Sequence, residues 1–156
     1  MLSDGDRIRN LLGTYCELID RADYDGVAAL FADDGVLTAE DGTELARGTA
    51  AIAEHFRSLI RLHDGQQRTK HVVANTVLEQ DTDGGIIARS SYVVLQATAD
   101  LPLQPIIAGR YVDRFRRVDG ATGDHHGDEV GRGWRWIELQ YAADPVGHLS
   151  QHIGRL

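Results

Sequence analysis

Asp20 and His71 are the two residues whose types and placement best suit proton-transfer chemistry in this sequence. His71 stands in the segment TKHVVANTVLE, where alternation places it on the same strand face as Val73, Asn75 and Val77. That face is expected to be buried because it is mostly apolar. A lone histidine on an apolar strand is more often a satisfied core residue than a catalyst. A catalytic interpretation of His71 therefore requires a partner for its ring.

Asp20 can be that partner. It follows the apolar positions Cys16 and Ile19 at the C-terminal end of a helical pattern, where a carboxylate meets the unfavourable end of the helix dipole. A surface aspartate at a helix end is common, and that alternative stays open. Helix ends that pack over a curved sheet point into the space between them, so this carboxylate can reach a strand histidine. A carboxylate that orients an imidazole is an arrangement for general base catalysis.

Tyr15 and Arg110 are two further candidate site residues. Tyr15 lies five residues before Asp20 on the core-facing side of the helix, and a buried tyrosine needs a hydrogen-bond partner for its hydroxyl. Core packing is the alternative role. Arg110 stands in the apolar stretch IIAGRYVDRF, and a buried arginine is costly unless it is paired or faces a cavity that receives an anion. The alternative is a salt bridge at the sheet edge with Asp113 or Glu138.

The remaining histidines form weaker patterns. His125 and His126 lie beside acids in the loop GATGDHHGDEVGRG, but adjacent histidines in a glycine-rich loop lack the fixed geometry of a metal site. His148 and His152 have helical metal-ligand spacing, although nothing nearby completes a ligand set. The sequence contains no phosphate-binding glycine loop, nucleophile elbow or zinc cysteine pair. We therefore expect neither a metal nor an organic cofactor.

The composition is that of an ordinary globular protein with an acidic surface. The 156 residues carry a formal net charge of −8, with 42% hydrophobic and 26% charged residues, so one domain over residues 1–156 is expected. A negative field disfavours nucleic acid and anionic membranes as partners. Cys16 is the only cysteine, and the opening MLSDGDRIRN has acids where a signal peptide has its basic region. These features predict a cytoplasmic protein without a disulfide or a membrane span.

Hydrophobic periodicity divides the chain into a helical part and a strand part. The first part has a period near 3.6 and predicts helices over 3–20, 24–31 and 49–63, with a small hairpin of 36–38 and 44–46. The second part has a period of 2 and predicts strands over 68–79, 86–98, 106–118 and 134–143. Asp83, Gly84 and Gly85 form a tight turn, and Pro102 and Pro105 mark a wider link. This order predicts an α+β fold whose helices cover one face of a curved, antiparallel sheet.

Four segments together carry a resemblance to a known family: IRNLLGTYCELIDRADYDGVAALFADDGVL, ARGTAAIAEHF, RTKHVVANTVLE and AGRYVDRFRR. In this order and spacing they resemble the SnoaL-like branch of the nuclear transport factor 2-like superfamily, over nearly the whole chain. The resemblance implies a cone-shaped α+β barrel in which three N-terminal helices and a curved, mostly antiparallel sheet enclose a pocket. It also implies a homodimer, or a higher homo-oligomer, formed through the open face of the sheet.

Within that superfamily the chain is similar to the scytalone dehydratase, bile-acid dehydratase and hexachlorocyclohexane dehydrochlorinase group. In that group a helix-end aspartate and a strand histidine form a catalytic pair, and Asp20 and His71 fall on those places. Tyr15 is similar to the tyrosine of the dehydratases, and Arg110 to the pocket arginine of the group. The resemblance implies a cofactor-independent lyase that eliminates water or another small group from a hydrophobic cyclic substrate.

Other members of the superfamily leave alternatives open. Ketosteroid isomerases and polyketide cyclases share the fold with different polar residues, and small subunits of ring-hydroxylating dioxygenases have no chemistry of their own. An isomerase, a cyclase, or a non-catalytic binding or partner subunit are therefore the alternatives to a lyase. The loop GATGDHHGDEVGRG before the last strand departs from the compact family pattern.

Overall fold

The computed structural model describes residues 2–118 and 133–154 of the chain. Its helices are α1 (Asp4–Asp20), α2 (Tyr24–Ala29) and α3 (Thr49–Leu59). Its strands are β1 (Phe31–Ala39), β2 (Glu44–Arg47), β3 (Thr69–Gln80), β4 (Ile86–Thr98), β5 (Leu101–Arg117) and β6 (Trp134–Val146). The strands form one sheet in the order β2-β1-β6-β5-β4-β3. All neighbouring pairs are antiparallel except β1 and β6, which run parallel.

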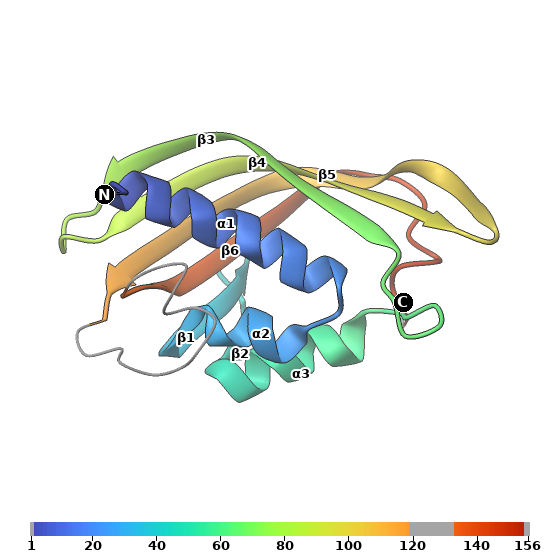
Figure 1. The fold of residues 1–156 in the computed structure, drawn as a ribbon, viewed down its shortest axis with the longest axis horizontal. Helices are drawn as coiled ribbons and strands as arrows, with labels where there is room; N and C mark the ends of the chain where they lie inside the picture. Colours follow the sequence, from blue (N-terminus) through green and yellow to red (C-terminus); the bar gives the residue numbers. More distant parts are fainter. Residues whose placement is uncertain (1, 119–132, 155–156) are drawn as a thin grey trace.

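The three helices lie on one side of the curved sheet, with α1 along the long strands and α2 and α3 near β1 and β2 (Figure 1). This arrangement confirms the predicted α+β class with three helices on a mostly antiparallel curved sheet. None of the helices among the described residues has the length and apolarity needed to cross a membrane.

Helix α1 has well-defined ends, and these ends position its last residue. Ser3 caps its first turn, because the Ser3 hydroxyl accepts from the Asp6 N–H while the Asp6 carboxylate accepts from the Ser3 N–H. At the other end, Ala22 has a φ of 60° and the chain turns back toward α2. The Asp23 N–H donates to the Leu18 carbonyl oxygen at 3.0 Å within this turn. Asp20 is therefore the last helical residue, directly before a sharp change of direction.

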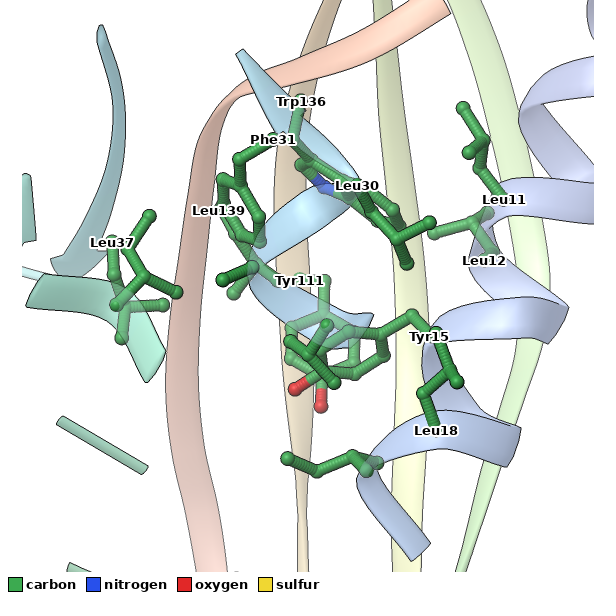
Figure 2. Packing of buried hydrophobic residues seen from close by; sticks show 14 of the residues in the cluster. Leu11, Leu12, Tyr15, Leu18, Leu30, Phe31, Leu37, Tyr111, Trp136 and Leu139 are labelled. Atoms are coloured by element: carbon green, nitrogen blue, oxygen red, sulfur yellow. The ribbon is translucent and has the colours of Figure 1, made fainter. Parts of the chain in front are cut away.

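The core between the helices and the sheet contains a cluster of aromatic rings among its aliphatic residues. Trp136 of β6 is completely buried and contacts Phe115, with ring centroids 4.6 Å apart, and Tyr15, with centroids 5.8 Å apart. The hydroxyl groups of Tyr15 from α1 and Tyr111 from β5 lie side by side in this core (Figure 2). The part of α1 that carries Tyr15 thus packs against aromatic rings of β5 and β6.

Strand β3 changes its inward face partway along, which the alternating pattern did not predict. Asn75 adopts a φ of 54°, and the pairing with β4 shifts register between Ala74 and Val77. After this bulge Thr76 points inward, whereas Asn75 is exposed and Val77 is 50% exposed. His71 and Val73 share a half-buried face as predicted, but the prediction that Asn75 and Val77 continue that face is wrong.

Several predicted boundaries also differ from the structure. Helix α2 ends at Ala29 and Phe31 already belongs to β1, while α3 ends at Leu59, before His63. Strand β5 begins at Leu101 and contains both Pro102 and Pro105, so the wide link predicted there is wrong. The pairing of β4 with β5 is irregular near these prolines, which lack a backbone N–H for a regular ladder. The histidines at 125 and 126 lie outside the described residues.

Candidate active site

The structure brings Asp20 and His71 into direct contact. His71 Nδ1 lies 2.6 Å from Asp20 Oδ1, and the two side chains are only 8% and 11% exposed. The backbone N–H of His71 donates to both carboxylate oxygens, at 3.2 Å and 3.0 Å. The Thr69 hydroxyl donates to Asp20 Oδ1 at 2.9 Å. Three groups of one strand therefore hold the carboxylate that ends α1.

These contacts define the protonation state of the pair. Burial is the largest single influence on the pKa of Asp20 and raises it, but the hydrogen bonds from His71 and Thr69 outweigh burial and leave that pKa below its ordinary value. An ionised carboxylate can only accept hydrogen bonds, so the His71 Nδ1 facing it carries a proton. In the neutral ring, Nε2 then holds the lone pair that can accept a proton.

His71 lines a cleft of about 580 Å³ between α1 and β3, a size suited to a small molecule. The cleft is lined by Arg9, Leu12, Gly13 and Cys16 of α1 and by Lys70, His71, Val72, Val73 and Thr76 of β3. Its outer rim is exposed and carries two cations, Arg9 and Lys70. The cleft beside His71 is thus more open and more polar than the apolar, enclosed pocket expected from the sequence. Burial raises the pKa of the Cys16 thiol to about 12, so this thiol is protonated at neutral pH.

Tyr15 lies next to the pair but on the core side of it. Its ring meets the His71 ring edge-on, with centroids 6.5 Å apart, and the residue is 5% exposed. Burial raises the pKa of the Tyr15 phenol well above its ordinary value, although a hydrogen bond with Tyr111 opposes this. Tyr15 therefore stays protonated, and its hydroxyl is held within the core.

Arg110 does not belong to this site, and the prediction that it faces the pocket is wrong. Its side chain is 56% exposed and forms a fork with Asp144, with Nε–Oδ2 at 2.8 Å and Nη2–Oδ1 at 3.0 Å. Glu40 accepts a further hydrogen bond from Arg110 at 2.9 Å. The inward residues of β5 at this point are Tyr111 and Asp113, so the intervening even-numbered positions face outward. A surface salt bridge was the alternative, but its acids are Asp144 and Glu40.

Sequence reasoning missed two polar residues close to the pair. Thr69 lies two residues before His71, and strand periodicity places both on one face, so this contact could have been found. His152 is 6% exposed, and the charges of both His71 and Asp20 act on it. It lies in an irregular C-terminal segment, where no periodicity indicates which side chains are buried.

Asp113 is a third polar residue whose place differs from the sequence-based expectation. It is 1% exposed on the inward face of β5, and neither carboxyl oxygen has a hydrogen-bond partner among the described residues. Burial raises the pKa of Asp113 well above its ordinary value. The nearby Trp136 side chain lowers this pKa, but by less than burial raises it. Asp113 is therefore a neutral carboxylic acid within the core, and its location excludes a surface ion pair with Arg110.

A curved, mostly antiparallel sheet with three helices on one face is the nuclear transport factor 2-like arrangement of α+β folds. Residues 1–136 match the SnoaL-like domain, and the chain belongs to that family. The resemblance to the SnoaL-like branch of the superfamily is thereby confirmed.

Three solved structures show the extent of the similarity. A variant of Rv3472, a protein of unknown function from Mycobacterium tuberculosis, is 27% identical over 90% of this chain and 71% of its own, with a TM-score of 0.66. An NTF2-like protein with a cystatin-like fold from Novosphingobium aromaticivorans is 21% identical, over 90% and 81% of the two chains, with a TM-score of 0.68. The β subunit of a putative aromatic-ring-hydroxylating dioxygenase from the same organism is 18% identical, over 92% and 90%, with a TM-score of 0.63. The last two similarities concern the fold alone.

Proposed function

We propose that the protein is a cofactor-independent lyase that eliminates water or another small group from a hydrophobic cyclic substrate. The observation that carries this proposal is the 2.6 Å contact between Asp20 and His71, in which His71 also lines a cleft large enough for a small molecule. The carboxylate occupies Nδ1 of the ring and leaves Nε2 as the basic nitrogen. This geometry supports proton abstraction by His71.

The reaction follows from the protonation state of the pair. His71 Nε2 takes a proton from a substrate carbon next to the leaving group, and the electron pair of that C–H bond forms the new double bond. The leaving group departs with the electrons of its own bond to carbon. A hydroxide leaving group takes the proton back from the imidazolium as water, whereas with a halide leaving group the imidazolium releases the proton to solvent. Asp20 stabilises the imidazolium between these two steps, because its carboxylate stays ionised.

The test is activity in variants of the pair. We expect His71→Ala and Asp20→Ala to reduce turnover by roughly 10² to 10⁴ while the fold is retained. Steroid-like, polyketide-like and halogenated ring compounds are screened first for binding and then for loss of water or acid. The control is His148→Ala, because His148 is an exposed residue outside the site. Unchanged turnover in both pair variants would refute the lyase mechanism.

An isomerase or a cyclase is the nearest alternative enzyme. Proton abstraction beside a carbonyl by the same His71 serves those reactions equally well. The products separate the possibilities, since an elimination releases a small molecule and forms a double bond, whereas an isomerisation conserves the mass of the substrate. Mass spectrometry of the reaction mixture makes this distinction.

A non-catalytic partner or binding role is the alternative from a different class. It is favoured by the fold similarity to a dioxygenase β subunit and by the open character of the cleft. A ring compound that binds near His71 and is not converted under any condition would support this role. Perturbation of the His71 ring signals in an NMR titration with the compound reports binding independently of turnover.

A further inference from the structure

The C-terminal segment, residues 147–154, is fastened across the end of the sheet near the Asp20–His71 pair. The Arg61 N–H donates to the His152 carbonyl oxygen at 2.8 Å, and the Gly154 N–H donates to the Leu59 carbonyl oxygen at 3.1 Å. The His63 ring Nε2 lies 2.7 Å from the Gln151 carbonyl oxygen. The last described residues accordingly lie beside the connection from α3 to β3 (Figure 1). The segment is thus hydrogen-bonded to the connection that leads into β3, the strand that contains His71.

A short chain of contacts joins this segment to the catalytic pair. The Gln96 side-chain amide donates to the Gln151 carbonyl oxygen at 3.1 Å. Gln96 is the β4 partner of Thr69, and the Thr69 hydroxyl donates to Asp20. Residue 151 is therefore separated from the carboxylate by a single pair of strand residues. The next residue, His152, turns its side chain into the interior, where it is 6% exposed.

We propose that His152 is a positioning residue of the Asp20–His71 pair. The C-terminal segment places the His152 ring so that it excludes water from the carboxylate and keeps the His71 Nδ1 proton on its bond to Asp20. The consequence for catalysis rests on the proposed function, whereas the effect on the pair itself does not.

The charge state of His152 is consistent with this role. Burial lowers its pKa to about 4, and positive charge on His71 and His63 lowers it further, whereas Asp20 raises it. These three groups belong to β3, to the connection after α3 and to the end of α1. At neutral pH the ring is uncharged, so it does not compete with His71 for the carboxylate. Its Nδ1 is buried without a hydrogen-bond partner among the described residues, so packing rather than a bond of its own holds the ring there.

Exclusion of water matters because a carboxylate at a helix C-terminus has an easy alternative partner. A water molecule that reaches Asp20 can replace the His71 Nδ1–H as a hydrogen-bond donor to the carboxylate. The His71 ring is then free to rotate or change tautomer. A dry surrounding also strengthens the charge-assisted hydrogen bond between the two residues. The remaining bonds to Asp20 come from Thr69 and the His71 backbone, and these hold the carboxylate but not the ring.

The experiment measures solvent exchange of the His71 Nδ1 proton by NMR, which requires no substrate. We expect exchange to be at least about tenfold faster in His152→Ala than in the wild type, and close to the wild-type rate in His152→Phe, which refills the space. The matched control is His148→Ala, because His148 is an exposed histidine of the same segment. Amide exchange at Gly154 reports whether the segment stays docked.

Two outcomes would overturn the proposal. One is a wild-type exchange rate in His152→Ala, and the other is fast exchange in His152→Phe while the Gly154 amide stays protected. Once a substrate is known, His152→Ala should lower kcat by roughly tenfold with little change in KM, because the residue does not touch the substrate. If no substrate is ever converted, the lyase proposal fails, but the proton-exchange result still decides the role of His152.

Discussion

At the residue scale, the polar groups of the interior fall into a satisfied set and an unsatisfied set. The Asp20 carboxylate accepts bonds from the His71 ring, the His71 backbone and Thr69. The Asp113 carboxyl accepts none among the described residues, although it is more deeply buried. Burial without partners favours the neutral form, so one acid is ionised and the other is protonated in the same core. Two carboxyl groups with opposite shifts should have opposite effects on stability as the pH changes.

The Asp113 shift predicts a stability difference that grows with pH. Its folded pKa is raised, so its contribution is fully present below the unfolded pKa and is lost as the pH rises toward the folded pKa. We expect Asp113→Asn and the wild type to have the same free energy of unfolding near pH 3. Above pH 4 the difference in favour of Asp113→Asn should grow by up to about 1.4 kcal/mol per pH unit. Urea unfolding at several pH values measures this. Asp144→Asn, at an exposed acid paired with Arg110, is the control and should show no such gain.

Tyr15 is the residue whose direct and indirect roles can be separated most simply. Its ring contacts His71 edge-on while its hydroxyl lies beside Tyr111, so we expect it to orient the imidazole rather than to donate a proton. Tyr15→Phe keeps the ring and should reduce turnover by less than about tenfold, whereas Tyr15→Ala should also destabilise the core by roughly 3 to 5 kcal/mol. Steady-state kinetics and thermal unfolding of both variants provide the test. A loss near 10³ in Tyr15→Phe would assign the hydroxyl a direct role.

At the element scale, the sequence predicted the presence and order of the secondary structure better than the faces of the strands. Helix α1 could be found because Ser3 and Asp6 form a capping box ahead of a regular apolar stripe. The inward face of β3 could not be followed past Asn75, because a one-residue bulge has no apolar signature.

The outward direction of Arg110 could have been predicted. Arg114 and Arg116 share its parity along β5, while Tyr111 and Phe115 have the opposite parity and are buried. The apolar flank of Arg110 obscured this alternation. The burial of His152 had no local signal of any kind, because it depends on hydrogen bonds to distant residues such as Arg61.

The C-terminal segment should open in acid. The pKa of His152 is lowered from 6.5 to about 4 on burial, so its stabilising contribution is present above pH 6.5 and is lost as the pH falls toward 4. We expect the free energy needed to open the docked segment to fall by on the order of 3 kcal/mol over that range. Amide exchange at Gly154 as a function of pH measures the opening. His152→Gln cannot take up a proton there, and its exchange should lack this pH dependence once the intrinsic rate is removed.

At the scale of the whole molecule, the helices cover one face of the sheet and leave the other open. Three apolar residues form a row across that outer face, namely Val72 of β3, Val93 of β4 and Ala108 of β5. Val72 is 45% exposed. Charged pairs flank this apolar row, including Arg110 with Asp144 and Arg89 with Glu79. An apolar centre with a polar rim is typical of protein interfaces. On this basis we propose that two copies associate through the open face, as the family resemblance implies.

Association through this face predicts a homodimer of twice 17.1 kDa at micromolar concentration. Val93→Glu should convert it to a monomer, because a charge in the centre of the row would be buried without a partner in an interface of about 1,200 to 2,000 Å². Leu62→Glu is the matched control, since Leu62 is exposed but lies outside the sheet. Size-exclusion chromatography with light scattering measures the mass of each variant. A monomeric wild type, or a Val93→Glu variant that remains a dimer, would show that the outer face has no role in assembly. The exposed apolar row would then need another partner.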